Sequence, residues 1–294
     1  MKAKTSHQGQ TRQAQPVKNI LFPTDFSEEA MRAFEFAVEI ADQLGANIII
    51  YHAYHYAVTG EFYVVPELIE RIHAEMKDQA LVEFQEYEAQ ARARVGAKMK
   101  LAYKVDQDFA VEGILRVIEE SKADLVIMGT KGGENMWQRW MGSLTSLVIE
   151  RAEVPVLAVP AEILQLPIRH ILYATNFEEE DQQIPSLVPT LAQQFNAELT
   201  CLHIRTLSEV EKPYAYQAAF QRMKESVGNR VTAECVVLHA KEPWQGIEEY
   251  MQHHRVDLVV TLTRHHTLLE RLFQQSLTRE AALKSQWPVL ALKS

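Results

Sequence analysis

Residues 18–26 read KNILFPTDF, and the pattern returns 151 positions later as RHILYATNF in residues 169–177. The same spacing aligns ANIIIYH at residues 46–52 with AELTCLH at residues 197–203. Further along, a spacing of 133 aligns four more pairs: Gly113-Ile114 with Gly246-Ile247, Asp124-Leu125-Val126 with Asp257-Leu258-Val259, Ser143-Leu144-Thr145 with Ser276-Leu277-Thr278, and Pro155-Val156-Leu157-Ala158 with Pro288-Val289-Leu290-Ala291. Matches in one order at two constant spacings predict an internal duplication. The first half then carries 18 additional residues between Ala53 and Ala97.

Each half alternates short apolar runs, typical of buried strands, with segments of helical periodicity. In the first half we expect strands at 18–23, 47–53, 98–105, 124–129 and 155–159, and helices at 28–44, 66–95, 109–121 and 143–152. In the second half we expect strands at 169–174, 198–204, 231–238, 257–262 and 288–292, and helices at 182–195, 209–227, 243–254 and 276–285. Ser27 is a candidate N-cap for the first helix, and Gly45 ends it. The alternation predicts an α/β fold with two tandem five-stranded parallel-sheet domains.

The domains are expected at residues 17–160 and 168–294, joined by a short linker that ends at Pro167. Residues 1–16 are polar and rich in glutamine, so we expect a flexible tail.

The composition is that of a globular protein, with 47% hydrophobic and 23% charged residues. A net charge of −9 argues against a nucleic-acid or anionic membrane surface. No apolar run approaches the ~20 residues of a membrane helix, and no secretory signal is evident at the N-terminus. The two cysteines, Cys201 and Cys235, make no disulfide framework and are interpreted as buried free thiols. These features favour a cytoplasmic location.

A glycine-rich segment follows the apolar run 124–128: Gly129-Thr130-Lys131-Gly132, nine further residues, and then Gly142-Ser143. Glycines let backbone N–H groups approach an anion closely because they carry no Cβ. A helix that begins near Ser143 would aim its free amides at the same place. The segment therefore predicts a phosphate site built from main chain. Lys131 and Arg139 could neutralise phosphate charge there, or could be solvated loop cations.

Doubly wound sheets bind ligands at the carboxyl ends of their strands, where the strand order reverses. With strand order 3-2-1-4-5, that crevice lies between strand 1, which ends in Pro23-Thr24-Asp25, and strand 4, which ends at Met128-Gly129. We expect the first to hydrogen-bond a ribose or base and the second to hold phosphates, while His52-Ala53 forms the adenine-side wall. Asp25 could instead cap the next helix.

After residue 17 the chain resembles a tandem universal stress protein, with two UspA-type domains in one polypeptide. The family's signature G-x2-G-x9-G-[ST] reads Gly129, Gly132, Gly142 and Ser143, and its His-Val on strand 2 appears as His52-Ala53. The resemblance implies a Rossmann-like fold of the adenine nucleotide alpha hydrolase type, ATP binding with Mg²⁺, a stress-response or signalling role, and slow hydrolysis at most. The nucleotide-binding residues it implies are Pro23, Thr24, Asp25, Ala53, Met128, Gly129, Lys131, Gly132, Arg139, Gly142, Ser143 and Leu144.

The second half departs from this signature. Leu262, His265 and Gln275 stand where the three glycines stand, and Asn176 replaces Asp25. Ser276 alone is retained. We therefore predict one ATP per chain, bound in the N-terminal half.

The last strand of each half is short and apolar, and it forms an edge in the expected strand order. In the family this strand pairs two domains, so the resemblance implies that the halves dock as a pseudo-dimer. Homodimerisation of the chain is left open. His52 and His203 end strand 2 in both halves, which favours a structural role.

No catalytic or metal-binding constellation is identifiable. Adjacent histidines at 253–254 and 265–266 lack further ligands at zinc spacing, and Asp106 and Asp108 lack a nucleophile. Two alternatives to an ATP-binding regulatory module stay open. One is a slow ATPase or nucleotidyl-transfer enzyme that uses Asp25 or Glu134. The other is a scaffold without nucleotide, whose second half binds a partner or an apolar ligand.

Overall fold

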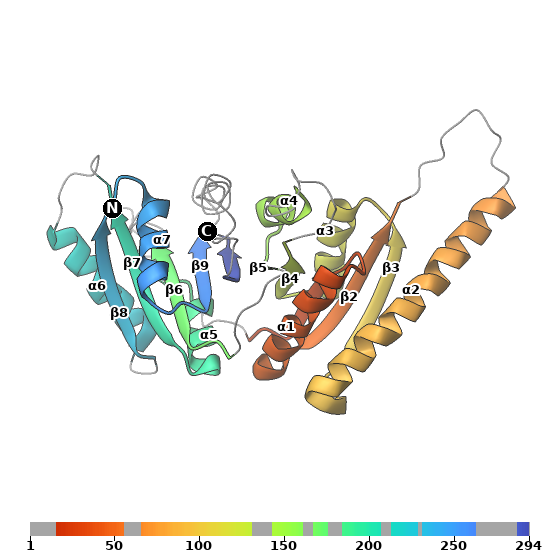
Figure 1. Cartoon of the computed structure of the whole chain (residues 1–294), viewed down its shortest axis with the longest axis horizontal. Coiled ribbons are helices and arrows are strands. Elements are labelled where there is room, and N and C mark those ends of the chain that lie inside the picture. The colour runs from red at the N-terminus through yellow and green to blue at the C-terminus, as the bar shows by residue number, and fades with distance from the viewer. Residues whose placement is uncertain are drawn as a thin grey trace, which may run out of the picture.

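The computed structural model describes residues 16–55, 66–130, 143–160, 167–175, 184–206, 213–228, 231–262 and 287–293. The described strands form one ten-stranded sheet in the order β3-β2-β1-β4-β5-β10-β9-β6-β7-β8 (Figure 1). The strands are β1 Asn19–Pro23, β2 Asn47–Tyr54, β3 Leu101–Gln107, β4 Leu125–Gly129, β5 Val156–Val159, β6 His170–Thr175, β7 Glu198–Arg205, β8 Ala233–His239, β9 Leu258–Leu262 and β10 Val289–Leu292.

The helices cover both faces of this sheet. They are α1 Glu28–Leu44, α2 Pro66–Val95, α3 Ala110–Ser121, α4 Ser143–Arg151, α5 Leu187–Phe195, α6 Pro213–Val227 and α7 Pro243–His253, with a 3₁₀ turn η1 at Gly96–Lys98. One apolar core joins the sheet to α1, α2, α5 and α6, and a second joins its other face to α3, α4 and α7. Alternate residues of β4 enter the two cores, as expected for a strand buried on both faces. The predicted α/β fold is confirmed.

Strands within each half pair in parallel, and the two halves meet at an antiparallel pair. β5 and β10 join with Ala158 opposite Val289 and Val156 opposite Ala291. Figure 1 shows this seam at the centre of the sheet, between the two sets of helices. The seam leaves β3 and β8 as the outermost strands of the described sheet.

Local sequence signals fix both ends of α1. Ser27 Oγ accepts the backbone N–H of Ala30 at the start of α1, and Gly45 ends this helix with φ 64°, as predicted. The strand expected from residue 98 begins at Leu101, because η1 occupies 96–98. The helix expected from residue 182 begins at Leu187, because Pro185 restricts the residue before it to extended backbone. The helix expected at 276–285 and the start of the one expected from 209 lie outside the described residues.

A carboxylate clasp is repeated in the two halves. Asp124 Oδ2 accepts the backbone N–H groups of residues 18 and 19 at 2.8 and 3.0 Å. Asp257 Oδ2 accepts those of residues 169 and 170 at 2.7 and 2.9 Å. Each clasp fixes the start of the first strand of its half beside the fourth. The same device at equivalent positions is the structural counterpart of the sequence repeat.

Candidate functional site

The carboxyl ends of β1 and β4 lie side by side at one edge of the sheet. The strands pair in parallel through residues 20–21 and 125–126, and β2 lies on the other side of β1. This is the switch point of the first half, where doubly wound sheets bind ligands. The structure therefore brings residues 23–25, Ala53 and residues 128–129 to the same edge of the sheet.

Thr24 is buried at the end of β1, and its N–H, carbonyl and hydroxyl all form hydrogen bonds within the protein. Its N–H donates to the Tyr51 carbonyl at 2.9 Å, and its carbonyl lies 2.8 Å from Nδ1 of His52. The hydroxyl accepts the N–H of Phe26 at 2.9 Å and lies 2.7 Å from the hydroxyl of Tyr87. Thr24 therefore holds the end of β1 to both β2 and α2.

Asp25 comes next and is exposed. Its Oδ1 accepts the backbone N–H of Ser27 at 3.0 Å, so it supports the turn that begins α1. Phe26, between them, has φ 63°, a left-handed conformation that side chains rarely adopt. Its ring lies 4.4 Å from the imidazole of His52, which holds this turn in place. The end of β1 thus presents an exposed carboxylate on a fixed turn.

His52 on β2 and His203 on β7 are equivalent residues, and each contacts the carbonyl of a threonine at the end of the neighbouring strand. His52 Nδ1 lies 2.8 Å from the Thr24 carbonyl, and His203 Nδ1 lies 3.0 Å from the Thr175 carbonyl. Because the half without the glycine signature retains this contact, it supports the structural role inferred for both histidines.

Thr145 ties α4 to the end of β4. Its hydroxyl donates to the Gly129 carbonyl at 3.0 Å, and its side chain is buried. The Thr130 N–H donates to the carbonyl of Val159 on β5 at 2.9 Å. The first turn of α4 is therefore held against the carboxyl end of β4. Free amides of a helix N-terminus at this place suit an anion.

The structure places the other predicted site residues only in part. Leu144 lies in the first turn of α4, half-buried against the core beneath it. Ser143 begins this helix. Lys131, Gly132, Arg139 and Gly142, together with Glu134, lie outside the described residues.

Gly129 is not required by the fold. Its φ lies outside the left-handed region, and an added Cβ would meet Ala33 Cβ at 3.5 Å and the Glu29 carbonyl at 3.9 Å, which are ordinary contacts. In the second half the equivalent positions hold Leu262 and Ile184, both buried in the core. The small residues Gly129 and Ala33 of the first half thus correspond to the large apolar residues Leu262 and Ile184 of the second half. The sequence analysis found Leu262 but missed the Ala33–Ile184 exchange, which the 151-residue spacing of the repeat could have revealed.

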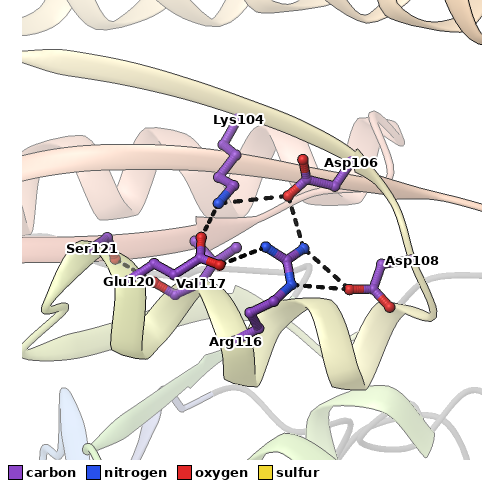
Figure 2. Close-up of polar contacts among 7 residues, drawn as sticks. All are labelled: Lys104, Asp106, Asp108, Arg116, Val117, Glu120 and Ser121. Carbon is purple, nitrogen blue, oxygen red and sulfur yellow. Dashed lines mark hydrogen bonds and ion pairs between the residues drawn. The ribbon is translucent and has the colours of Figure 1, made fainter.

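Asp106 and Asp108 belong to an ion-pair network (Figure 2). Arg116 Nη2 lies 2.8 Å from Asp106 and 3.1 Å from Asp108, and Nη1 lies 2.9 Å from Glu120. Lys104 contacts Asp106 and Glu120. Hydrogen bonds from Lys104 and Arg116 lower the pKa of the Glu120 carboxyl. These carboxylates are paired with cations and serve to hold α3 against β3.

The histidines at 253–254 bond to their own helix. His253 Nδ1 lies 2.8 Å from the Glu249 carbonyl, and His254 Nδ1 lies 3.0 Å from that of Tyr250. Across the described ranges, no three histidine, cysteine or acidic side chains gather in a way that could hold a metal ion. No helix among these residues is both long and apolar enough to span a bilayer.

We expect Tyr87→Phe to destabilise the protein by about 1 kcal/mol, since it removes the hydrogen bond to buried Thr24. The ring would keep its packing, with Phe34 at 4.6 Å. Burial raises the pKa of Tyr87 to about 12, as expected for a hydroxyl held inside the core. Urea denaturation measures the loss.

The matched control is Tyr51→Phe. The Tyr51 hydroxyl is buried and finds no hydrogen-bond partner in the described structure, so its removal is expected to be neutral or stabilising. Equal destabilisation by the two changes would contradict the role assigned to Tyr87.

Comparison with known proteins shows that both halves of the chain resemble the same protein family. The Universal stress protein family matches residues 16–160 and again residues 167–293. A universal stress protein of Synechocystis sp. is 22% identical over 94% of this chain and 100% of its own length. One from Thermus aquaticus is 32% identical over 48% of this chain and 98% of its own length. The crystal structure of a universal stress protein from Archaeoglobus fulgidus has a TM-score of 0.66 at 17% identity, covering 94% of this chain and 96% of that one. The chain therefore belongs to the universal stress protein family and carries the family's domain twice in tandem.

Proposed function

We propose that this chain is a stress-response regulatory or signalling module that binds one ATP, in its N-terminal half. The observation that carries the proposal is the joint of β1, β4 and α4, by which we mean the place where the carboxyl ends of β1 and β4 meet the N-terminus of α4. There the first turn of α4 is fixed to the Gly129 carbonyl, and the exposed carboxylate of Asp25 lies at the same edge of the sheet. Large apolar side chains occupy the equivalent of Gly129 and Ala33 in the second half.

ATP would place its phosphates at the free amides of α4 and of the glycine segment 129–142, where the helix dipole favours negative charge. Lys131 and Arg139 would neutralise part of that charge. Asp25 would accept hydrogen bonds from the ribose or base, and Ala53 would line the adenine side. Pro23, Thr24, Met128 and Leu144 would form the walls.

Mg²⁺ would neutralise phosphate charge when bound. Because Mg²⁺ commonly binds through substrate phosphates and waters with one or two carboxylates, it does not require a protein ligand cage.

Binding would act through the loop 130–142, by changing the surface that it shows to a partner. This role needs no catalytic base. The antiparallel pairing of β5 with β10 supports treating the halves as a pseudo-dimer, in which one copy binds nucleotide. A homodimer of the chain and a cytoplasmic location stay predictions.

Calorimetric titration with ATP and Mg²⁺ should give one site per chain. At ATP concentrations 100-fold above Kd, binding to the native state should add about 2.7 kcal/mol of stability. Gly142→Leu should weaken binding about 100-fold or more, because a side chain would enter the phosphate cradle. Gln275→Leu, at the equivalent position of the second half, should leave affinity unchanged.

The alternatives give different results. Two equivalent sites, or equal losses in Gly142→Leu and Gln275→Leu, would refute the one-site proposal. Sustained ADP release that Asp25→Ala abolishes without loss of binding would indicate a slow ATPase. Absence of any stabilisation at millimolar ATP would favour the scaffold without nucleotide.

A further inference from the structure

The two cysteines of the chain, 34 positions apart, face each other across two neighbouring strands. Cys201 on β7 stands in register with Cys235 on β8. Both side chains lie on the sheet face covered by α6. Cys201 belongs to the same core as Met223 and Val227 of this helix, and Cys235 packs against that core.

This register suits a disulfide. Directly paired residues on neighbouring strands lie about 4.8 Å apart, a separation within the range of about 4.4–6.8 Å that Cα atoms of bridged cysteines show. Side chains of paired residues also point to the same face of the sheet. A bond between the two sulfurs therefore keeps the strand pairing and requires side-chain rotation and a small approach of the two Cβ atoms, to the separation of about 3.5–4.5 Å that bridged cysteines show.

The two thiols differ in access. Cys201 is fully buried, whereas Cys235 is half-buried on β8, the outermost strand of the described sheet. A hydrogen bond with the Cys201 thiol lowers the pKa of Cys235, and the charge of Lys224 on α6 adds to this effect, while burial and Glu234 oppose it. Because the thiolate is the nucleophile, Cys235 is placed to react first and Cys201 to react second.

We propose that Cys201 and Cys235 form a dithiol modification site that hydroperoxides oxidise to an intramolecular disulfide. The Cys235 thiolate attacks one peroxide oxygen, the O–O bond breaks, and a sulfenic acid and hydroxide form. The Cys201 thiol then attacks the sulfenic sulfur. The S–S bond forms, the S–O bond breaks, and the leaving hydroxide takes the thiol proton as water. Two electrons pass from the dithiol to one peroxide.

The site lies in the second half, away from the joint of β1, β4 and α4, and it does not depend on ATP binding. Oxidation would tie β8 to β7 beneath α6. The second half would then carry a response to oxidants while the first half responds to nucleotide.

The test is oxidation of the full-length reduced protein with hydrogen peroxide, followed by intact-mass measurement and peptide mapping under non-reducing conditions. We expect both free thiols to disappear, the mass to fall by two hydrogens, and one peptide pair to contain Cys201 joined to Cys235. Dithiothreitol should restore both thiols. No other intramolecular disulfide can form, because the chain has no further cysteine.

Two single variants separate the roles of the thiols. Cys201→Ser should accumulate a sulfenic acid at Cys235 that dimedone traps, whereas Cys235→Ser should leave Cys201 unmodified under the same treatment. Disulfide-linked dimers, sulfinic acid without an internal bond, or retention of both thiols in the wild-type protein would overturn the proposal. So would equal dimedone labelling of the two variants. The wild-type mass measurement decides the matter even if a variant fails to fold.

Discussion

Asp257→Ala is expected to lower the free energy of unfolding by about 3 kcal/mol, since it removes two backbone hydrogen bonds to a carboxylate and a third from Arg255 Nε. Asp257 is 7% exposed, and its Oδ2 accepts the N–H groups of residues 169 and 170. Alanine would leave these amides without their acceptor at the start of β6, beside β9. Urea denaturation measures the total loss, and hydrogen exchange at the two amides reports it locally.

Two variants control for the location and nature of this effect. Asp257→Asn keeps a side-chain oxygen in the same place, so it should lose less than half as much stability. Asp124→Ala removes the equivalent clasp of the first half, where Asp124 is half-buried and water can replace part of the bonding. An Asp257→Ala protein as stable as the wild type would show that the clasp does not stabilise the fold.

Gly113→Ala should destabilise the first half by about 2–3 kcal/mol through overpacking. A Cβ at Gly113 would lie 2.0 Å from the Tyr51 hydroxyl and 3.2 Å from Asp108 Cβ. Tyr51 is 1% exposed, so its ring has little room to move away. α3 therefore approaches β2 closely only because residue 113 has no side chain. Thermal and urea unfolding measure the loss.

The double variant Gly113→Ala with Tyr51→Phe tests the cause. Removing the hydroxyl leaves Tyr51 Cζ as the nearest ring atom, 3.0 Å from the new Cβ, so part of the stability should return. Gly129→Ala is the control, since its Cβ meets only ordinary contacts and should change stability by about 0.5 kcal/mol or less. If Tyr51→Phe restored no stability to Gly113→Ala, the clash with the Tyr51 hydroxyl would not be the cause of the destabilisation.

The repeat predicted the fold because its strands are short, continuous apolar runs, which are typical of a sheet that helices cover on both faces. The ends of α1 were predicted because Ser27 and Gly45 are strong local signals. The start of α5 was wrong, since Pro185 outweighed the helical periodicity that precedes it. Local signals decide an element's ends only where one of them dominates.

Long-range contacts were beyond sequence reasoning. The bond between Thr24 and Tyr87 joins residues 63 positions apart and depends on where α2 crosses the sheet. The facing of Cys201 and Cys235 depends on the register of β7 and β8. The glycine signature located the candidate site, but the tie from Thr145 to Gly129 required the structure.

The antiparallel seam of β5 and β10 has an evolutionary consequence. In an assembly of two identical chains, every substitution enters both subunits, so a site cannot be closed in one subunit and kept in the other. In a single polypeptide that restriction does not apply, because the aligned positions of the two halves can hold different residues, as Gly129 and Leu262 do. Covalent linkage also keeps the two halves paired at any protein concentration, because their pairing does not require two chains to meet in solution.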